Sequence, residues 1–325
     1  NKHIRIKVMK KNVKGLFLAI FAIALTACNS NDDGVLAGIE IPGITITDDI
    51  DCCSAEEALQ VYRFLQTVKI VPELTTEIDG KYNVYAYTKT GTFHTGYNEI
   101  YFVATKKSTG NYIKNFELTN LTPLMHMVKM DMYHSTPVGS AAASFNDGYL
   151  AVKRSWVSFL MNTSEAGSWT LSYDSQVLGS KGGIEKKDII VNALPEGQVW
   201  LKSFKIGSDA YFLSLVNPID FKTGTNEIRA YVSKKSEKAT NPYQIATEIF
   251  TVDIDPRMPD MGNHTSPDNT SLTKQSDGSY AGIINLTMTG LWRIHLTVRN
   301  AEGTIVAGGD DQSDGYSSLF WDVTI

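Results

Sequence analysis

The sequence has few cysteines, no cluster of basic residues and almost no long apolar stretches, and each shortage excludes a class of protein. Three cysteines among 325 residues cannot build a disulfide framework, so hydrophobic cores must hold the folded parts together. An apolar content of 42 % is sufficient for such cores. With a formal net charge of −5, the chain offers no basic stripe to meet phosphates, which excludes a nucleic-acid partner.

Recognisable reaction motifs are also missing. The sequence has no Gly-x-Ser-x-Gly elbow, no His-Glu-x-x-His pair and no phosphate-binding loop. Its six histidines are dispersed along the chain. We therefore predict a binding protein and not an enzyme.

The one long apolar run, residues 16–25, lies close to the beginning of the chain. It is too short to span a bilayer, but it follows several lysines after Met9, the expected start, as the core of a signal peptide does. The run ends in Leu-Thr-Ala ahead of Cys28, which resembles the lipobox of bacterial lipoproteins. This resemblance implies a signal peptide over 1–28, a lipid on Cys28 and a membrane as partner through that anchor.

Residues 29–68 are expected to form a polar, acidic tether followed by a short helix at 54–65. The acidic stretch resembles the surface-export signals of some bacterial lipoproteins, and a plain solvated linker is the alternative. Ser54 and Glu57 have the spacing of a capping box for the helix. The expected location is the bacterial outer membrane, on its periplasmic or cell-surface face.

The rest of the chain is a tandem repeat. The sequence Gly-x-Asn-Glu-Ile at 96–100 recurs at 224–228, an Asp-Gly pair at 147–148 recurs at 277–278, and Trp169 recurs as Trp292. Each copy has short alternating strands separated by turn residues. The prediction is an all-β protein with two tandem immunoglobulin-like β-sandwich domains, at 69–195 and 196–325, preceded by the signal peptide and the short helix.

Each repeat carries a loop rich in methionine and histidine. In the second repeat Met258, Met261 and His264 are three residues apart, and a loop bent by proline and glycine is expected to point them at one place. Thioether and imidazole groups suit copper, above all Cu(I). We therefore predict that these three residues bind a metal ion.

The corresponding loop of the first repeat contains Met130, Met132 and His134. On an extended segment, residues at this alternate spacing share one side. His126 is expected on the same side as a further ligand, whereas Met125 is expected to pack in the core. Lys129 places a positive charge in this loop, which opposes a bound cation.

The second repeat resembles the YtkA-like and FixH-like domains of bacterial envelope proteins. The residues that carry the resemblance are the Gly-x-Asn-Glu-Ile sequence, the Met258-to-His264 loop, an Asp-Gly-x-Tyr turn at 277–280 and a Met-x-Gly-x-Trp sequence at 288–292. The first repeat follows the pattern more loosely. What the resemblance implies is an envelope β-sandwich linked to copper handling, with copper as the expected cofactor.

Two alternatives stay open. Methionine also fills gaps in hydrophobic cores, and proline and glycine also shape ordinary turns. The modules would then serve cell-surface adhesion or scaffolding, with no metal role. The sequence names no protein partner for either function.

Overall fold

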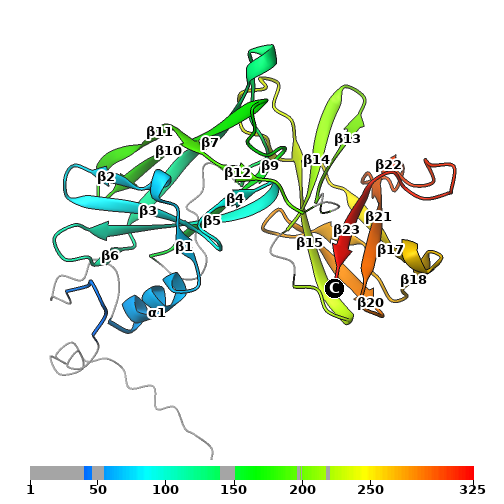
Figure 1. Ribbon diagram of the computed structural model, residues 1–325, viewed down its shortest axis with the longest axis horizontal. Coiled ribbons are helices and arrows are strands. Elements are labelled where there is room, and N and C mark those ends of the chain that lie inside the picture. Colours follow the sequence, from blue (N-terminus) through cyan, green and yellow to red (C-terminus); the bar gives the residue numbers. More distant parts are fainter. Residues whose placement is uncertain (1–39, 46–54, 140–150, 196–197, 199, 217–219) are drawn as a thin grey trace, which may run out of the picture. The chain divides into compact units, whose positions relative to one another are not determined.

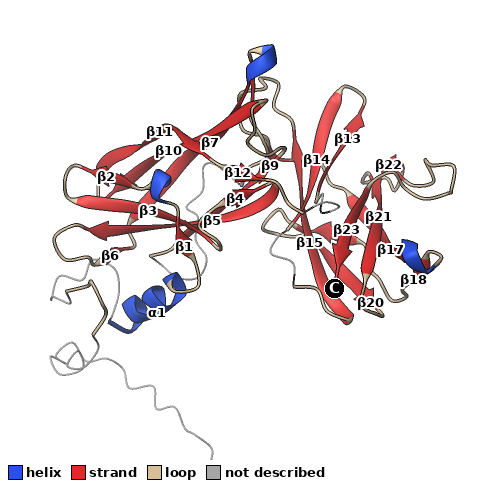
Figure 2. Ribbon diagram, viewed as in Figure 1, coloured by secondary structure: helices blue, strands red, loops and turns tan. Residues whose placement is uncertain are grey.

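Between the predicted helix and the C-terminus, the regular secondary structure that the computed structural model describes is almost entirely β-sheet (Figures 1 and 2). The structure describes residues 40–45, 55–139, 151–195, 198, 200–216 and 220–325. The predicted signal peptide, the lipobox with Cys28 and most of the acidic tether, residues 29–39 and 46–53, lie outside the described residues. All of the described residues belong to one compact unit of the chain.

Helix α1 (Ala55–Leu65) confirms the sequence prediction for residues 54–65. Glu56 and Glu57 lie in its first turn and Arg63 in its last, which favours the helix dipole. Its buried residues include Ala58 and Val61, which pack in a small apolar cluster with Val103 of the first repeat. The helix is thus an addition to the first β module.

The first repeat consists of two antiparallel sheets with a short parallel pair beside them. One sheet has the order β1-β3-β5-β6, with β2 on β3 and β9 on β5, and the other has the order β11-β10-β7-β8. The strands of the first sheet are β1 (Lys69–Ile70), β2 (Thr76–Ile78), β3 (Tyr82–Thr88), β5 (Gly96–Lys106), β6 (Tyr112–Ile113) and β9 (Lys153–Phe159). Those of the second are β7 (Phe116–Met127), β8 (Met132–His134), β10 (Gly167–Val177) and β11 (Ser180–Ile189), and the parallel pair is β4 (Phe93–His94) with β12 (Val191–Asn192).

A large apolar core lies between the sheets of the first repeat. It draws on the alternating buried positions of both sheets, for example Val84 and Ala86 of β3 and Leu171 and Tyr173 of β10. Trp169 is completely buried in it. Burial of alternate residues on each strand is the pattern of a β-sandwich.

The second repeat forms one continuous set of paired strands around its own core. The path runs β13-β14-β15-β20-β19-β17-β21-β22, so that the short strand β19 joins the two halves. The strands are β13 (Leu201–Ile206), β14 (Asp209–Leu215), β15 (Gly224–Lys234), β16 (Gln244–Ile245), β17 (Thr251–Met258), β18 (His264–Thr265), β19 (Leu272–Lys274), β20 (Tyr280–Leu286), β21 (Leu291–Arg299), β22 (Ile305–Gly308) and β23 (Phe320–Thr324). Trp292 and Trp321 are completely buried in the core.

The two repeats match strand for strand where the sequence repeat is clearest. Strand β5 pairs with β3 and β9, and β15 pairs in the same way with β14 and β20. Both β5 and β15 begin at a glycine with a positive φ, +82° at Gly96 and +93° at Gly224. That conformation is accessible to glycine at little cost, which accounts for the repeated Thr-Gly turn. The all-β prediction with a sandwich in each repeat is confirmed.

Among the described residues, short 3-10 turns interrupt the sheets at η1 (Pro72–Leu74), η2 (Val128–Met130) and η3 (Pro259–Met261). Turn η2 connects β7 with β8, and η3 connects β17 with β18. The two methionine- and histidine-rich loops are therefore β-hairpins, each with a 3-10 turn at its tip. The tip of β7 extends from the first repeat in Figure 1.

Candidate metal-binding hairpins

The β7–β8 hairpin pairs its methionines and histidines in a defined register. Met125 lies opposite His134, and Met127 lies opposite Met132. Directly opposite residues of an antiparallel pair point to the same face, and so do alternate residues along a strand. These four residues therefore share one face of the hairpin, with Cβ atoms of opposite residues roughly 5 Å apart.

This shared face extends from the core to solvent. Met125 is buried beside Trp169, its partner on β10. Met127 is partly buried against the core, and Met132 at the tip is 57 % exposed. The side chain of His134 is half-buried, with its ring edge-on to the indole of Trp169 at a centroid distance of 5.7 Å. The face thus presents sulfur and imidazole groups at the rim of the sandwich.

The hydrogen bonding of His134 selects one tautomer. Its Nδ1 lies 2.8 Å from the main-chain oxygen of Ser135. A carbonyl oxygen only accepts, so Nδ1 carries the proton and Nε2 keeps its lone pair. The Ser135 hydroxyl in turn donates to the carbonyl of Pro123 at 2.6 Å and holds the segment in place. An imidazole fixed through Nδ1 in this way has the arrangement typical of a histidine that ligates through Nε2.

Two residues of the sequence-based ligand set lie elsewhere. His126 is opposite Tyr133 on the other face of the hairpin, where the two rings stack at 4.4 Å and His126 Nε2 lies 3.0 Å from a carboxylate oxygen of Asp131. Met130 lies in η2 and not on a strand, because the chain turns there and Asp131 adopts a left-handed conformation with φ of +45°. The expectation that His126 and Met130 share a side with Met132 and His134 is therefore wrong.

The β17–β18 hairpin is shorter. Met258 lies opposite His264, and η3 follows Met258 directly. Gly262 and Asn263 then take positive φ angles, +63° and +58°, to complete the turn. Asn263 closes it by donating its main-chain N–H to the carbonyl of Met258 at 3.0 Å.

The three predicted ligands of this second hairpin do not form one solvent-open group. Met258 is only 3 % exposed and belongs to the core of the second repeat, whereas Met261 is 55 % exposed on the turn and His264 is exposed on β18. Arg257 and Asp260 suggest a polar loop from sequence, but the strand directs Met258 inward. There it lies against Gly290, the residue before β21, on which a Cβ would lie 2.9 Å from the methyl group of Met258. The expected solvent-facing position of Met258 is therefore wrong.

Both hairpins nevertheless share one arrangement: a methionine and a histidine opposite each other beside a buried tryptophan. In the second repeat the rings of His264 and Trp292 are 6.4 Å apart. Each tryptophan is fixed through its indole N–H, which donates at 2.9 Å to the carbonyl of Met161 for Trp169 and of Met288 for Trp292. Both repeats therefore place a methionine, a histidine and a tryptophan in the same arrangement at this hairpin.

Met127 is the residue that sequence reasoning missed. In the sequence repeat it corresponds to Pro256, and the sequence-based interpretation assigned it no role. The signal available in the sequence was symmetry about the turn, because Met127 and Met132, like Met125 and His134, are equally distant from its centre. Such symmetry is expected in an antiparallel hairpin.

Within the described ranges, no three or more His, Cys, Asp or Glu side chains are grouped as metal ligands usually are. The donors that the hairpins bring together are mostly thioethers, which that set of residue types does not include. Among the helices of the described residues, none has the length and apolar character needed to span a bilayer.

Comparison with known proteins gives no family. No family model matches the chain, and no curated protein matches it either. Among solved structures, the chain is similar to one titled pT26-6p, with a TM-score of 0.22, 8 % identity, and coverage of 79 % of this chain and 67 % of that one. It is also similar to the Bacteroides ovatus mixed-linkage glucan utilization locus protein SGBP-B in complex with a mixed-linkage heptasaccharide, with a TM-score of 0.16, 10 % identity, and coverage of 79 % and 70 %. Neither TM-score establishes a common fold.

Proposed function

We propose that this chain is a binding protein that takes up copper, as Cu(I), on the β7–β8 hairpin through Met127, Met132 and His134. The observation that carries the proposal is the register of the hairpin, which sets these side chains on one face. Met125 lies beneath them as a further sulfur donor on the same face. His126 and Met130 lie outside this ligand set, on the other face and in η2.

The donor chemistry supports Cu(I) over harder cations. Thioethers are neutral and polarizable, and they favour Cu(I) over Zn²⁺ or Mg²⁺. His134 offers Nε2 with its lone pair, because Nδ1 is engaged with the carbonyl of Ser135. Burial of one side of the face against Trp169 removes water from that side, and the exposure of Met132 leaves a path of entry.

For the second hairpin we propose a weaker site at His264 and Met261. Met258 shares the face of His264, but it is buried in the core. A ligand role for Met258 would require its side chain to leave the contact with Gly290. Arg257 adds a positive charge next to the hairpin, although Asp255 offsets it at 2.8 Å.

We also propose that the chain is an outer-membrane lipoprotein anchored at Cys28, with YtkA-like domains. The lipobox-like sequence and the order of motifs in the second repeat support this. An exported protein meets oxidising conditions, in which thioethers are more durable ligands than thiolates. That compartment would explain a copper site built without cysteine.

A paired substitution tests the copper proposal. Met130 and Met132 are equally exposed at 57 %, but only Met132 lies on the shared face. Met132→Leu keeps the apolar volume and removes the sulfur, and Met130→Leu is its matched control. In competition with a chromophoric Cu(I) chelator, we expect Met132→Leu to weaken binding by roughly tenfold or more and Met130→Leu to leave it unchanged. Equal affinities for wild type and Met132→Leu would refute the site.

One observation favours the alternative role in adhesion or scaffolding. The tip of the first hairpin exposes large apolar side chains, namely Val128 at 53 % and Tyr133 at 46 % besides Met130 and Met132. Exposed apolar groups gathered at one place often mark a contact surface. In that case both leucine substitutions would preserve the function, because both preserve the apolar surface.

A further inference from the structure

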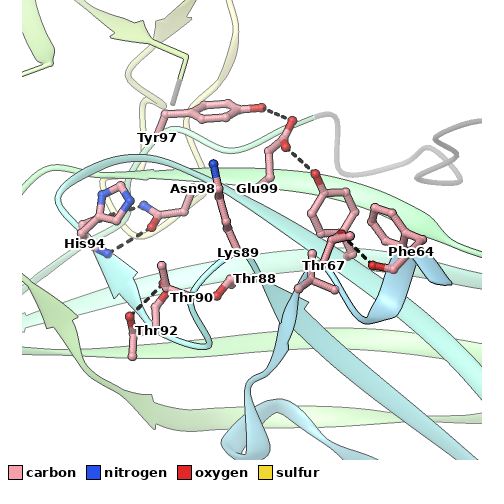
Figure 3. Close-up of a pocket in the computed structure, with 12 residues that line it drawn as sticks. Phe64, Thr67, Thr88, Lys89, Thr90, Thr92, His94, Tyr97, Asn98 and Glu99 are labelled. Atoms are coloured by element: carbon pink, nitrogen blue, oxygen red, sulfur yellow. Dashed lines mark hydrogen bonds between the residues drawn. The ribbon is translucent and has the colours of Figure 1, made fainter. Parts of the chain in front are cut away.

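A pocket of about 460 Å³ lies in the first repeat, and it shares no residue with the metal-binding hairpins. Its walls come from three segments: the end of α1 with Phe64, Thr67 and Val68, the β3–β4 turn at residues 88–92, and the start of β5 (Figure 3). The volume is in the range of small-molecule sites, which is roughly 300–1,000 Å³.

The walls are held by hydrogen bonds of their own. The Asn98 amide accepts from the main-chain N–H of His94 at 3.0 Å and donates to the carbonyls of His94 and Gly96 at 2.7 and 2.8 Å. The Thr88 hydroxyl donates to the carbonyl of Thr92 at 3.1 Å and accepts from the N–H of Gly91 at 2.9 Å. The pocket is therefore formed by the fold before any ligand arrives.

Comparison with the second repeat shows what is specific to this pocket. The second repeat has a smaller hollow, of about 300 Å³, at the corresponding place, lined by Asn226, Glu227 and Arg229. There Glu227 forms an ion pair with Arg229. In the first repeat the matching positions are Glu99 and Tyr101, and α1, which lies outside the repeat, adds a third wall. The helix has thus enlarged a shared hollow into a pocket in one copy only.

The carboxylate of Glu99 is the polar centre of the pocket. Its two oxygens accept hydrogen bonds from the hydroxyls of Tyr97 at 3.2 Å and Tyr101 at 2.5 Å (Figure 3). Burial, together with the negative charge of Glu99, raises the pKa of Tyr97, so its hydroxyl stays protonated and continues to donate. A carboxylate oxygen accepts more than one hydrogen bond, so Glu99 retains capacity for a ligand donor.

Lys89 supplies the complementary group. It is exposed on the β3–β4 turn, and Figure 3 shows its side chain reaching toward the side of the pocket where Glu99 and Tyr97 lie. The threonine hydroxyls at 67, 90 and 92 add groups that both donate and accept. The rings of Phe64 and Tyr101, edge-to-face at 5.0 Å, give the pocket an apolar side.

These groups exclude several kinds of ligand. A purely apolar molecule would displace water from Glu99 and Lys89 without replacing the hydrogen bonds that this water makes. The pocket is lined by charges of both signs, Glu99 and Lys89, and the charge of Glu99 is partly offset by Arg154, whose Nη1 lies 3.7 Å from it. An ion of either sign therefore meets a like charge in the pocket. A neutral ring with many hydroxyls meets every requirement, because hydroxyls donate to a carboxylate, accept from an ammonium, and leave C–H faces for aromatic contact.

We propose that this pocket binds one sugar residue of a neutral saccharide, with Glu99 and Lys89 bonding its hydroxyls and Phe64 and Tyr101 packing against its ring. The proposal is independent of the copper site. It assigns the added helix a role in ligand binding and leaves the second repeat without such a role.

Saturation-transfer difference NMR and calorimetric titration of the full chain test the proposal. The probes are glucose, galactose, mannose, xylose and N-acetylglucosamine with their β-linked disaccharides, and glycine and alanine serve as zwitterionic comparators. We expect at least one sugar to bind. Glu99→Gln and Lys89→Met should each weaken that binding by about tenfold. Lys89→Met is the safer variant for folding, because Lys89 is exposed.

Glu227→Gln is the matched control, since Glu227 occupies the corresponding hollow of the second repeat. It should bind sugar as the wild type does. The proposal is overturned if no probe sugar binds, if the amino acids bind in their place, or if Lys89→Met and Glu99→Gln bind sugar with unchanged affinity while circular dichroism shows both variants folded.

Discussion

His134 meets Trp169 edge to face, with the ring planes at 90° and the centroids 5.7 Å apart. The imidazole is fixed by the carbonyl of Ser135 and the indole by the carbonyl of Met161. Neither ring can turn without losing a hydrogen bond. The indole therefore has a constant position beside the sulfur and imidazole face, which makes it an intrinsic reporter of what that face binds.

The first prediction uses this reporter. Cu(I) bound at the β7–β8 hairpin should quench the fluorescence of Trp169, and Trp169→Phe should remove most of the quenching caused by the first equivalent of metal. Trp321→Phe is the control, because Trp321 is buried in the core of the second repeat. Fluorescence titration under anaerobic conditions checks this. Quenching that is the same in both variants would place the metal away from the first hairpin.

The second prediction concerns the close contact between β10 and β7 beneath the sulfur and imidazole face of the first hairpin. A Cβ on Gly167 would lie 2.6 Å from the terminal carbon of Met125 and 2.9 Å from the main-chain oxygen of His126. The methionine can move, but the carbonyl belongs to the paired strand and cannot yield cheaply. Gly167→Ala should therefore destabilise the first repeat by roughly 1–3 kcal/mol.

Urea unfolding followed by circular dichroism measures this loss. Ser168→Ala, a change at the next and exposed position of β10, is the control and should leave the midpoint nearly unchanged. An unchanged midpoint for Gly167→Ala would show that β7 and β10 separate more easily than their register suggests.

The sequence predicted the helix, the all-β class and the core position of Met125, and the structure confirms all three. These features follow from local patterns: a capping pair, alternation along strands and a repeated order of motifs. The sequence did not predict which candidate ligands share one face of a hairpin, because that depends on which residues of the two strands lie opposite each other. The sequence does not reveal that Asp131 takes a left-handed conformation, and this conformation decides that Met130 leaves the strand.

Burial of Met258 illustrates the same limit. Its neighbours Arg257 and Asp260 are polar, so the segment reads as an exposed loop. The inward direction comes from the pairing of β17 with β21. Gly290, just before β21, has no Cβ and so leaves room for the long side chain of Met258 in the core that also holds Trp292. Contacts between strands distant in sequence determine burial here, and no local pattern encodes them.

The third prediction tests an ion pair of the second repeat. Arg293 holds Asp322 through two hydrogen bonds of 2.8 Å, from Nε and Nη2, and its guanidinium lies 4.0 Å from the ring centroid of Phe320. The Asp322 side chain is only 12 % exposed. A lysine keeps the charge but neither the paired hydrogen bonds nor the flat contact with the ring.

Arg293→Lys should therefore lower the free energy of unfolding by about 1–2 kcal/mol, measured as a shift of the urea midpoint. The comparison variant is Arg229→Lys, whose arginine pairs with Glu227 at a more exposed position. It should have a smaller effect, because exposed ion pairs contribute little. A larger loss for Arg229→Lys than for Arg293→Lys would contradict the importance of the bidentate geometry.

The fourth prediction concerns acid stability. Burial disfavours the ionised form of Glu248, but hydrogen bonds from Lys234 at 2.9 Å and from the Tyr211 hydroxyl at 2.8 Å outweigh it and lower the pKa of Glu248 from 4.5 to about 2. A carboxyl with a lowered pKa in the folded state stabilises that state at pH values above 4.5. This contribution is lost as the pH falls from there toward 2, because the unfolded chain takes up the proton first.

Glu248→Gln removes the titrating group, so its cost should be largest near neutral pH and should shrink as the pH falls through this window. Urea midpoints of wild type and variant at pH 7, 5 and 3 measure the difference. The control is Glu237→Gln, a change at an exposed residue for which the structure gives no hydrogen bond or ion pair; it should leave the midpoint nearly constant at all three pH values. A cost of Glu248→Gln that is the same at pH 7 and pH 3 would mean that the ion pair with Lys234 does not stabilise the ionised carboxylate in solution, and that the neutral hydrogen bonds alone hold this corner of the sheet.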